Sequence, residues 1–378
     1  MTRPEALEFA GELVRAVNAR DTARLLSLYS ENAVARSPMF REIAGRAAIA
    51  ENWRTLFSLF PDLTVETKEV MVDGPRIALI GAVRATDRNG WFGQTPTGER
   101  IDYRCVILLE LAAGKIVRDE RLYDLAGVLE RLEKSRIDKE LRTAAEVQRM
   151  LLSCKTCRTA HCEAAGDSVP CRSIGGDFFE MIPLASGAFG IALGDVSGKG
   201  PAAALLAAMI QGMLAAEAEN EARPSAVVGK LNRSLARRKF DARFATLVYG
   251  ILSPDGRFAC TNAGHNPPIL LSGGHIRRLT SGGPPLGLFE QAGFEEETLS
   301  LGAGDRLVLF SDGVTEARNA ADEEFGDDRL IACATGFTAA PPSQMVAGIL
   351  AHLRKFCGGM PYHDDVTLAV ARRIRSIE

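Results

Sequence analysis

The spacing of apolar residues divides the chain into three stretches. In the first stretch, apolar positions recur at helical spacing over three segments, followed by runs rich in β-branched residues that predict strands. The helical segments are 4–19, 22–30 and 46–60. Asp73-Gly74 and Ala113-Gly114 are turn signals between the strands. We therefore expect an α+β domain in which an antiparallel sheet curls around the helices, a curl that can leave a pocket.

The second stretch, residues 124–152, contains no strand signal, no proline and a single glycine. Apolar residues fall near heptad spacing with charged residues between them, which predicts one long amphipathic helix. Such a helix either packs on its own domain or forms a parallel coiled coil with a second copy, and the pattern favours neither. In both cases it would be a rigid connector that can pass on a twist or a change in dimerisation.

The third stretch, from about residue 154 onward, alternates strands with helices. An apolar strand runs into the turn at Asp195, and Pro201 then opens an Ala-rich helix. A hairpin turns at 253–256, and a strand at 365–373 closes the chain. The three stretches predict domains at 1–125 and 154–378, joined by a linker helix at 126–153.

Composition narrows the class of protein. The chain has 378 residues, which fits two domains and a connector. Its net charge of −3 excludes the strong positive field of a general nucleic-acid binder. No apolar run approaches the roughly 18 residues that span a bilayer, and the first 20 residues lack the apolar core of a signal peptide. We therefore expect a cytoplasmic protein whose eight cysteines are thiols or metal ligands.

Aspartates in the third stretch recur at the ends of apolar strands, beside glycine or serine. They are Asp177, Asp195, Asp312, Asp364 and Asp365. Buried carboxylates that converge repel one another unless cations hold them together, and ligands that are all oxygen favour Mg²⁺ or Mn²⁺. Two such ions can activate a water and clamp a phosphate. The alternative is ordinary turn chemistry, and the spacing alone does not prove that the aspartates converge.

Several motifs of the third stretch resemble the PPM-type metal-dependent serine/threonine phosphatases, in particular the bacterial branch of stage II sporulation protein E and the sigma-factor regulators. The motifs are GGDFFE, GDVSGKGPAAALLAA, GGPPLGL, GDRLVLFSDGVTEARN and HDDVTLAV, within about 145–378. The resemblance implies an α/β/β/α sandwich of two antiparallel sheets flanked by helices. It also implies hydrolysis of phosphoserine or phosphothreonine.

The resemblance also implies roles for single residues. Asp195 would bridge two Mn²⁺ or Mg²⁺ ions, and the Val196 carbonyl would bind one of them. Asp312 and Asp364 would hold the other ion, and Asp177 would bind a metal or orient its water. Asp365, where related phosphatases have Asn, would have a supporting role.

The proton donor remains open at this point, because Val196-Ser197 stand where eukaryotic members carry a histidine. The candidates are a metal-bound water, Lys199 and His265, although His265 fits better as an organiser of its loop. The resemblance implies a phosphorylated STAS-type anti-sigma-factor antagonist as substrate. The rival interpretations are a metal-binding scaffold without turnover and a small-molecule enzyme with an accessory phosphatase domain.

Cysteines crowd the junction between the linker helix and the third stretch. Cys154, Cys157, His161 and Cys162 are compatible with a zinc site or a redox pair, and Cys171 follows. No second pair of ligands completes the usual zinc motif. The interpretation we favour is free thiols in a junction loop and first strand.

The first domain resembles the SnoaL-like, nuclear-transport-factor-2-like domains. The similar segments are 18–34, 60–74 and 93–124. The resemblance implies a cone-shaped α+β barrel with an apolar cavity that could hold a small apolar ligand. The segment contains no histidine, and its acids Asp102, Asp119 and Glu120 carry no specific mark of catalysis. We therefore favour a sensory or dimerising domain, in a homodimer, over a second enzyme.

Overall fold

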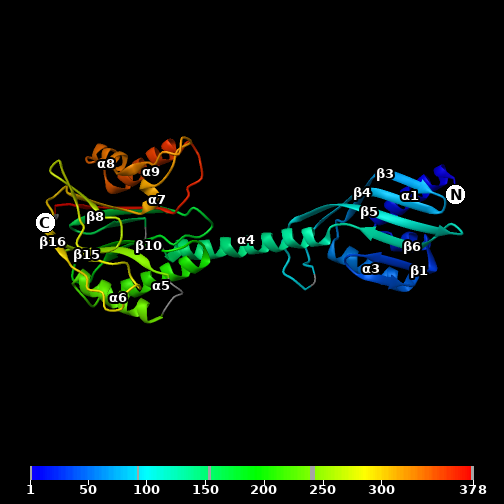
Figure 1. The fold of residues 1–378 in the computed structure, drawn as a ribbon, viewed down its shortest axis with the longest axis horizontal. Helices are drawn as coiled ribbons and strands as arrows, with labels where there is room; N and C mark the ends of the chain where they lie inside the picture. The colour runs from blue at the N-terminus through cyan, green and yellow to red at the C-terminus, as the bar shows by residue number, and fades with distance from the viewer. Residues whose placement is uncertain (1, 92, 152–154, 239–242, 376–378) are drawn as a thin grey trace. The chain divides into compact units, whose positions relative to one another are not determined.

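The computed structural model describes residues 2–91, 93–151, 155–238 and 243–375 (Figure 1). The chain divides into two compact units, Met1–Glu140 and Leu141–Glu378. Each unit has apolar core clusters of its own. The division falls inside one helix, α4 (Leu125–Leu151).

The first unit is an α+β domain, as predicted. Its helices are α1 (Arg3–Asn18), α2 (Thr22–Ser27) and α3 (Arg46–Leu59). Its strands are β1 (Tyr29–Ser37), β2 (Arg41–Ala44), β3 (Thr64–Asp73), β4 (Arg76–Thr86), β5 (Arg100–Ala112) and β6 (Lys115–Leu122). Thr2 and Glu5 cap α1 reciprocally, and Asp21 caps α2 by accepting from the Arg24 N–H at 2.9 Å.

The sheet of the first unit is open. Its strand order is β2-β1-β6-β5-β4-β3, so among the described residues β2 and β3 are edges and no closed barrel forms. The expected cone-shaped barrel is therefore a curved sheet that packs on α1 and α3. The segment 22–30 was expected to be helical throughout, but α2 stops at Ser27 and β1 begins at Tyr29. The Asp73-Gly74 and Ala113-Gly114 turns are confirmed.

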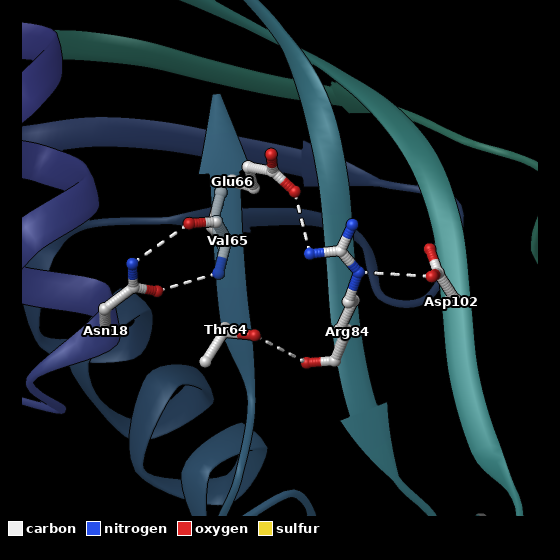
Figure 2. Close-up of polar contacts among 6 residues, drawn as sticks. All are labelled: Asn18, Thr64, Val65, Glu66, Arg84 and Asp102. Carbon is white, nitrogen blue, oxygen red and sulfur yellow. Dashed lines mark hydrogen bonds and ion pairs between the residues drawn. The ribbon is translucent and has the colours of Figure 1, made fainter. Parts of the chain in front are cut away.

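Polar contacts tie α1 to the sheet and cross the sheet's exposed side (Figure 2). The Asn18 amide donates to the Val65 carbonyl at 3.0 Å and accepts from the Val65 N–H at 2.7 Å. Arg84 on β4 pairs with Glu66 at 2.7 Å and with Asp102 at 3.2 Å. These ion pairs are exposed, so they contribute little to stability.

The second unit is the predicted α/β/β/α sandwich (Figure 1). One sheet has the order β15-β12-β11-β10-β9, with β16 on β12, and the other has the order β14-β13-β17-β18-β8-β7. The strands of the first sheet are β9 (Phe178–Pro183), β10 (Phe189–Val196), β11 (Ala245–Leu252), β12 (Arg257–Ala263), β15 (Gly282–Gly283) and β16 (Glu297–Ser300). Those of the second sheet are β7 (Thr156–Arg158), β8 (Cys162–Val169), β13 (Ile269–Ser272), β14 (His275–Arg278), β17 (Arg306–Phe310) and β18 (Val366–Arg373).

Helices cover the outer face of each sheet. On the first sheet lie α5 (Pro201–Ala218) and α6 (Pro224–Arg238), and on the second lie α7 (Asp312–Thr315), α8 (Gly326–Gly336) and α9 (Pro342–Cys357). The sheets pack on each other through a shared core that includes Leu193 and Leu309, both at most 2% exposed. This packing brings the ends of strands from both sheets to one place.

Helix α5 is apolar over most of its length. It has 18 residues with a mean hydropathy of 1.4, which is the length and composition of a membrane span. Its buried face, with Leu206, Ile210 and Leu214, packs into the core beneath the first sheet. Among the described residues α5 alone meets these limits, and its packing is that of a core helix.

Candidate active site

The end of the central strand β10 positions Asp195. β10 pairs with β9 and β11 on its two sides, and Asp195 lies opposite Thr246. The chain then turns, because the Ser197 N–H donates to the Phe244 carbonyl at 2.9 Å and Ser197 Oγ accepts from the Phe244 N–H at 3.0 Å. Gly198 and Gly200 have φ angles of 97° and 85°, which suit glycine. The turn leaves Asp195 and the Val196 carbonyl at the edge of the sheet.

A glycine loop brings Asp177 against this strand end. A Cβ on Gly176 would lie 2.8 Å from the Val196 carbonyl oxygen and 3.4 Å from Asp195 Oδ1, so only glycine allows so close an approach. Asp177 follows at once and is 4% exposed. Its Oδ2 is buried and has no hydrogen-bond partner among the described residues. A buried carboxylate with an open oxygen is suited to a cation.

The second sheet supplies Asp312 and Asp364. Asp312 follows β17 and Asp364 precedes β18, and because these strands are antiparallel neighbours, both acids lie at the same sheet edge. A Cβ on Gly313 would lie 2.1 Å from the Asp365 carbonyl oxygen, so the two segments cross closely. Ser311 Oγ holds the crossing, donating to that carbonyl at 3.1 Å and accepting from the Thr367 N–H at 3.0 Å.

The pKa shifts show that the acids form one electrostatic cluster. Burial, and then the charge of Asp195, raise the pKa of Asp177 well above its ordinary value. Burial and the charge of Asp312 raise the pKa of Asp195 to about 6. Burial and Asp364 likewise raise the pKa of Asp312. The structure therefore brings Asp177, Asp195, Asp312 and Asp364 together, and their mutual repulsion calls for positive charge among them.

Asp365 organises the loop rather than adding an open ligand. Its Oδ1 accepts from the Cys171 N–H at 2.8 Å, and its Oδ2 accepts from the Gly176 N–H at 2.7 Å. The side chain is buried, so these two bonds hold the glycine loop in place. The geometry fits the supporting role that the resemblance implied.

The two protein candidates for proton donor are both engaged. His265 Nε2 donates to the Phe310 carbonyl at 3.2 Å, and Nδ1 lies 2.7 Å from Thr246 Oγ1, which donates to it. Burial lowers the pKa of His265 to about 4, so the ring is neutral. Lys199 Nζ pairs with Asp364 at 2.9 Å, and the hydrogen bond with Asp364 raises the pKa of Lys199. Neither group is a ready acid at neutral pH.

Sequence reasoning missed several residues that support the site. Ser311 and Thr367 lie inside the motifs FSDG and DDVT. The aspartates of those motifs were therefore the signal that could have pointed to them. Gln148 on α4 lies in AEVQRMLLS, which resembles the end of the linker helix in this family, but nothing in that segment marked Gln148 itself. Its amide donates to the Gly175 carbonyl at 2.8 Å and accepts from the Gly175 N–H at 3.3 Å, which pins the residue next to Gly176.

Among the described residues, one group of three ligand-type side chains has its ligand atoms within 4.8 Å of one another: Cys171, Asp364 and Asp365. Burial, and then the charge of Asp365, raise the pKa of Cys171 to about 11, so the thiol stays protonated beside the carboxylates. A protonated thiol is a poor metal ligand. The oxygen donors of the cluster remain the better ligands.

The cysteine cluster at the junction is only partly described. Cys154 lies outside the described residues, so the zinc or redox interpretation stays a prediction. Cys162 is buried in the core, and burial followed by the charge of Cys157 raises the pKa of Cys162 to about 12. His161 is buried, with Nε2 3.4 Å from the Leu252 carbonyl. These positions are those of packed side chains in β8 and the turn before it.

Comparison with known proteins points to one family. The family model for stage II sporulation protein E (SpoIIE) matches residues 185–374, and the SnoaL-like domain model matches residues 10–119. Phosphoserine phosphatase RsbU of Bacillus subtilis (strain 168) is 31% identical over 271 residues, which are 70% of this chain and 78% of RsbU.

Two further similarities agree with this assignment. Phosphoserine phosphatase RsbP of the same organism is 29% identical over 151 residues, 38% of this chain and 37% of RsbP. The SiaA-PP2C domain of Pseudomonas aeruginosa has the same fold, with a TM-score of 0.56 and 20% identity over 64% of this chain and 98% of that domain. This chain therefore belongs to the stage II sporulation protein E family and is a serine/threonine phosphatase that also carries a SnoaL-like domain.

Proposed function

We propose that this phosphatase dephosphorylates serine or threonine on a STAS-type anti-sigma-factor antagonist and thereby releases a sigma factor. The convergence of Asp177, Asp195, Asp312 and Asp364 at one edge of the sandwich is the observation that carries the reaction. Similarity to two phosphoserine phosphatases supports the same chemistry. The choice of partner rests on the resemblance to the sigma-factor regulators.

The residues present fit a pair of divalent cations, Mn²⁺ or Mg²⁺. All the candidate donors are oxygens. Asp177 Oδ2 is buried and has no hydrogen-bond partner among the described residues. Gly176 has no side chain that would cover the nearby Val196 carbonyl. Asp195 and the Val196 carbonyl would hold the ions together with Asp177, Asp312 and Asp364. Bound divalent cations supply the activation of water and the neutralisation of phosphate charge that hydrolysis needs.

The chain's own residues orient this chemistry. Asp365 fixes the backbone that carries Gly176 and Asp177, and Ser311 fixes the crossing beside Asp312. Lys199 is half-exposed beside Asp364, where its ammonium can meet the charge of an arriving phosphate. His265 is neutral and holds the β17 end to β11, and Lys199 is held by Asp364, so we assign the proton for the leaving hydroxyl to water.

We infer that the N-terminal domain (1–125) controls the phosphatase (154–378) through the linker helix (126–153), in a cytoplasmic homodimer. Several apolar side chains on α4 are exposed, and packing against a second copy of the helix would cover them. They are Leu129, Ile137, Val147 and Met150. A small apolar ligand in the N-terminal domain would be the signal.

The test of the partner uses the chain of 378 residues. Phosphate release is measured from a STAS-domain protein phosphorylated on serine, in Mn²⁺, and Asp312→Ala serves as a trap in a pull-down from native cytosol. We expect wild type to release phosphate and the trap to retain a phosphorylated STAS protein. Hydrolysis of an aryl phosphate without hydrolysis of any STAS phosphoprotein would refute the partner and leave the reaction standing.

A further inference from the structure

Arg243 lies just before strand β11, at the sheet edge where β10 ends in Asp195 and Val196. The two strands are antiparallel neighbours, and Val196 is paired with Ala245, the first residue of β11. Arg243 precedes Ala245 by two residues. The fold therefore brings Arg243 to the turn that follows Asp195, although no sequence motif marked it as part of the site.

Hydrogen bonds hold the backbone next to Arg243. The Ser197 N–H donates to the Phe244 carbonyl at 2.9 Å, and the Phe244 N–H donates to Ser197 Oγ at 3.0 Å. Ala245 and Leu286 exchange two further backbone bonds, at 3.1 and 2.7 Å. The position from which the Arg243 side chain starts is therefore fixed relative to the turn.

The Arg243 guanidinium lies against Gly198 of the same turn. A Cβ on Gly198 would be 3.2 Å from Arg243 Nη1. Gly198 follows Asp195 by three residues, so their Cα atoms are at most about 11 Å apart. Three residues of an extended peptide span about 10 Å. The guanidinium is therefore within reach of a substrate segment whose phosphorylated residue lies at the aspartate cluster.

Arg243 differs from the other arginines of the second unit that are withdrawn from water. Among the described residues, five further arginines there are buried or half-buried, and each donates to a carboxylate or to a backbone carbonyl. They are Arg278, Arg306, Arg318, Arg372 and Arg373. Arg243 is half-buried too, but it has no hydrogen bond or ion pair with any described residue. A partly buried cation without an acceptor is unfavourable, so a bound anion would stabilise it.

The chemistry of arginine selects the kind of anion. Its planar fork of N–H donors matches the oxygens of a phosphate or a carboxylate. Lys199, in the same turn, already pairs with Asp364 at 2.9 Å. We propose that Arg243 binds an oxyanion of the phosphorylated substrate segment, either the phosphate itself or a carboxylate beside it. The inference rests on the proposed hydrolytic centre and adds a substrate-binding residue to it.

A purely structural role for Arg243 makes a different prediction. If the guanidinium only covered Gly198 and kept the turn in shape, its loss would disturb the nearby Asp195 and Val196. Such a disturbance would lower kcat and raise the Mn²⁺ concentration needed for half-maximal activity. Loss of a substrate contact raises KM instead and leaves the Mn²⁺ requirement unchanged.

The test is steady-state kinetics of Arg243→Gln and Arg243→Lys in Mn²⁺, with the chain of 378 residues. The substrates are p-nitrophenyl phosphate and two phosphoserine peptides, one with glutamates and one with glutamines on both sides of the phosphoserine. Arg243→Gln is expected to raise KM about tenfold while kcat changes less than about threefold. Arg243→Lys is expected to recover part of the affinity, because it keeps the charge but not the fork.

The set of substrates identifies the oxyanion. A rise in KM for all three substrates identifies the phosphate, and a rise confined to the glutamate peptide identifies the carboxylate. Unchanged KM values in a folded Arg243→Gln, or a loss of kcat with a raised Mn²⁺ requirement, would overturn the proposal. Thermal unfolding checks that each variant is folded.

Arg233→Gln is the matched control. Arg233 also lies against a glycine, since a Cβ on Gly229 would be 3.4 Å from Arg233 Nη1, but it is exposed on helix α6. Its loss should leave all three KM values unchanged, and a rise equal to that of Arg243→Gln would refute the assignment. Wild type that releases no phosphate from p-nitrophenyl phosphate would contradict the hydrolytic centre and this inference with it. Unchanged KM in an active Arg243→Gln refutes the inference alone.

Discussion

At the scale of single residues, the site is a set of carboxylates that destabilise one another until something positive binds. Asp195 stands at the centre, because the charges of Asp312, Asp364 and Asp365 all raise its pKa. Asp365 instead accepts hydrogen bonds from two backbone N–H groups, those of Cys171 and Gly176. The neighbouring acids Asp364 and Asp365 of the HDDV motif therefore have different roles.

Asp195→Asn is expected to stabilise the metal-free protein while it removes activity. A folded-state pKa of about 6, against an ordinary 3.8, means that the ionised form destabilises the fold. This cost is absent below about pH 4 and fully present above about pH 6, where it amounts to about 1–3 kcal/mol. Urea unfolding in EDTA should therefore show the variant more stable than wild type at pH 7.5 but not at pH 4. A lower midpoint at pH 7.5 would contradict the electrostatic origin of the shift.

Gly176→Ala is expected to cost at least about tenfold in Mn²⁺-dependent activity, because its Cβ would press on the Val196 carbonyl at 2.8 Å. Gly212→Ala is the matched control, since a Cβ at that helical position meets nothing within 4 Å. The control should keep full activity and gain about 0.5–1 kcal/mol in unfolding free energy. Steady-state kinetics and urea unfolding of both variants test this prediction. Equal activities of the two variants would refute the close approach of Gly176 to the Val196 carbonyl.

At the scale of elements, strand ends place the acids and helix α4 reaches the loop that carries one of them. Gln148 binds both polar groups of the Gly175 backbone, one residue from Gly176. Helix α4 therefore links the second unit to the first along the chain and also contacts the glycine loop directly.

Gln148→Ala is expected to raise the Mn²⁺ concentration needed for half-maximal activity about three- to tenfold, because the loop carrying Asp177 loses a two-point support. Arg149→Ala is its control, since the Arg149 side chain bonds only to the Ala145 carbonyl of its own helix among the described residues. Titration of activity against Mn²⁺ measures both. The same half-maximal concentration for both variants would assign Gln148 no part in the metal site.

Most elements could be predicted because their apolar residues recur at a regular spacing over many residues, as in α4 and α5. It missed β1 and β2, because the buried positions of β1 are small residues such as Ala33 and Ala35 that give a weak alternating signal. Aspartates beside Gly and Ser marked the candidate site. The partners of those acids could not be read, since Ser311 meets Asp365 only when two distant strands become neighbours.

At the scale of the whole molecule, two units with separate cores should respond to separate ligands. Both tryptophans of the chain, Trp53 and Trp91, belong to the core of the first unit. Tryptophan fluorescence therefore reports on unfolding of that unit, whereas calorimetry sees both.

Saturating Mn²⁺ is expected to raise the midpoint temperature of one calorimetric unfolding transition. Tryptophan fluorescence is expected not to show this shift. Binding at about 100 times the dissociation constant adds about 2.7 kcal/mol, which corresponds to about 5–10 °C for a unit of this size. The fluorescence-detected Tm should move by less than about 1 °C. An equal shift in both signals would show that Mn²⁺ stabilises the first unit too, and would contradict the independence of the two cores.

The central claim is that the four converging aspartates form the hydrolytic metal centre. The most direct measurement is the release of inorganic phosphate from an aryl phosphate in Mn²⁺ by wild type, Asp195→Asn and Asp255→Asn. Asp255 is also followed by glycine in a turn, but it lies in the β11–β12 hairpin outside the cluster. We predict wild-type rates for Asp255→Asn and a loss of at least about a thousandfold for Asp195→Asn. Equal rates for wild type and Asp195→Asn would contradict the claim.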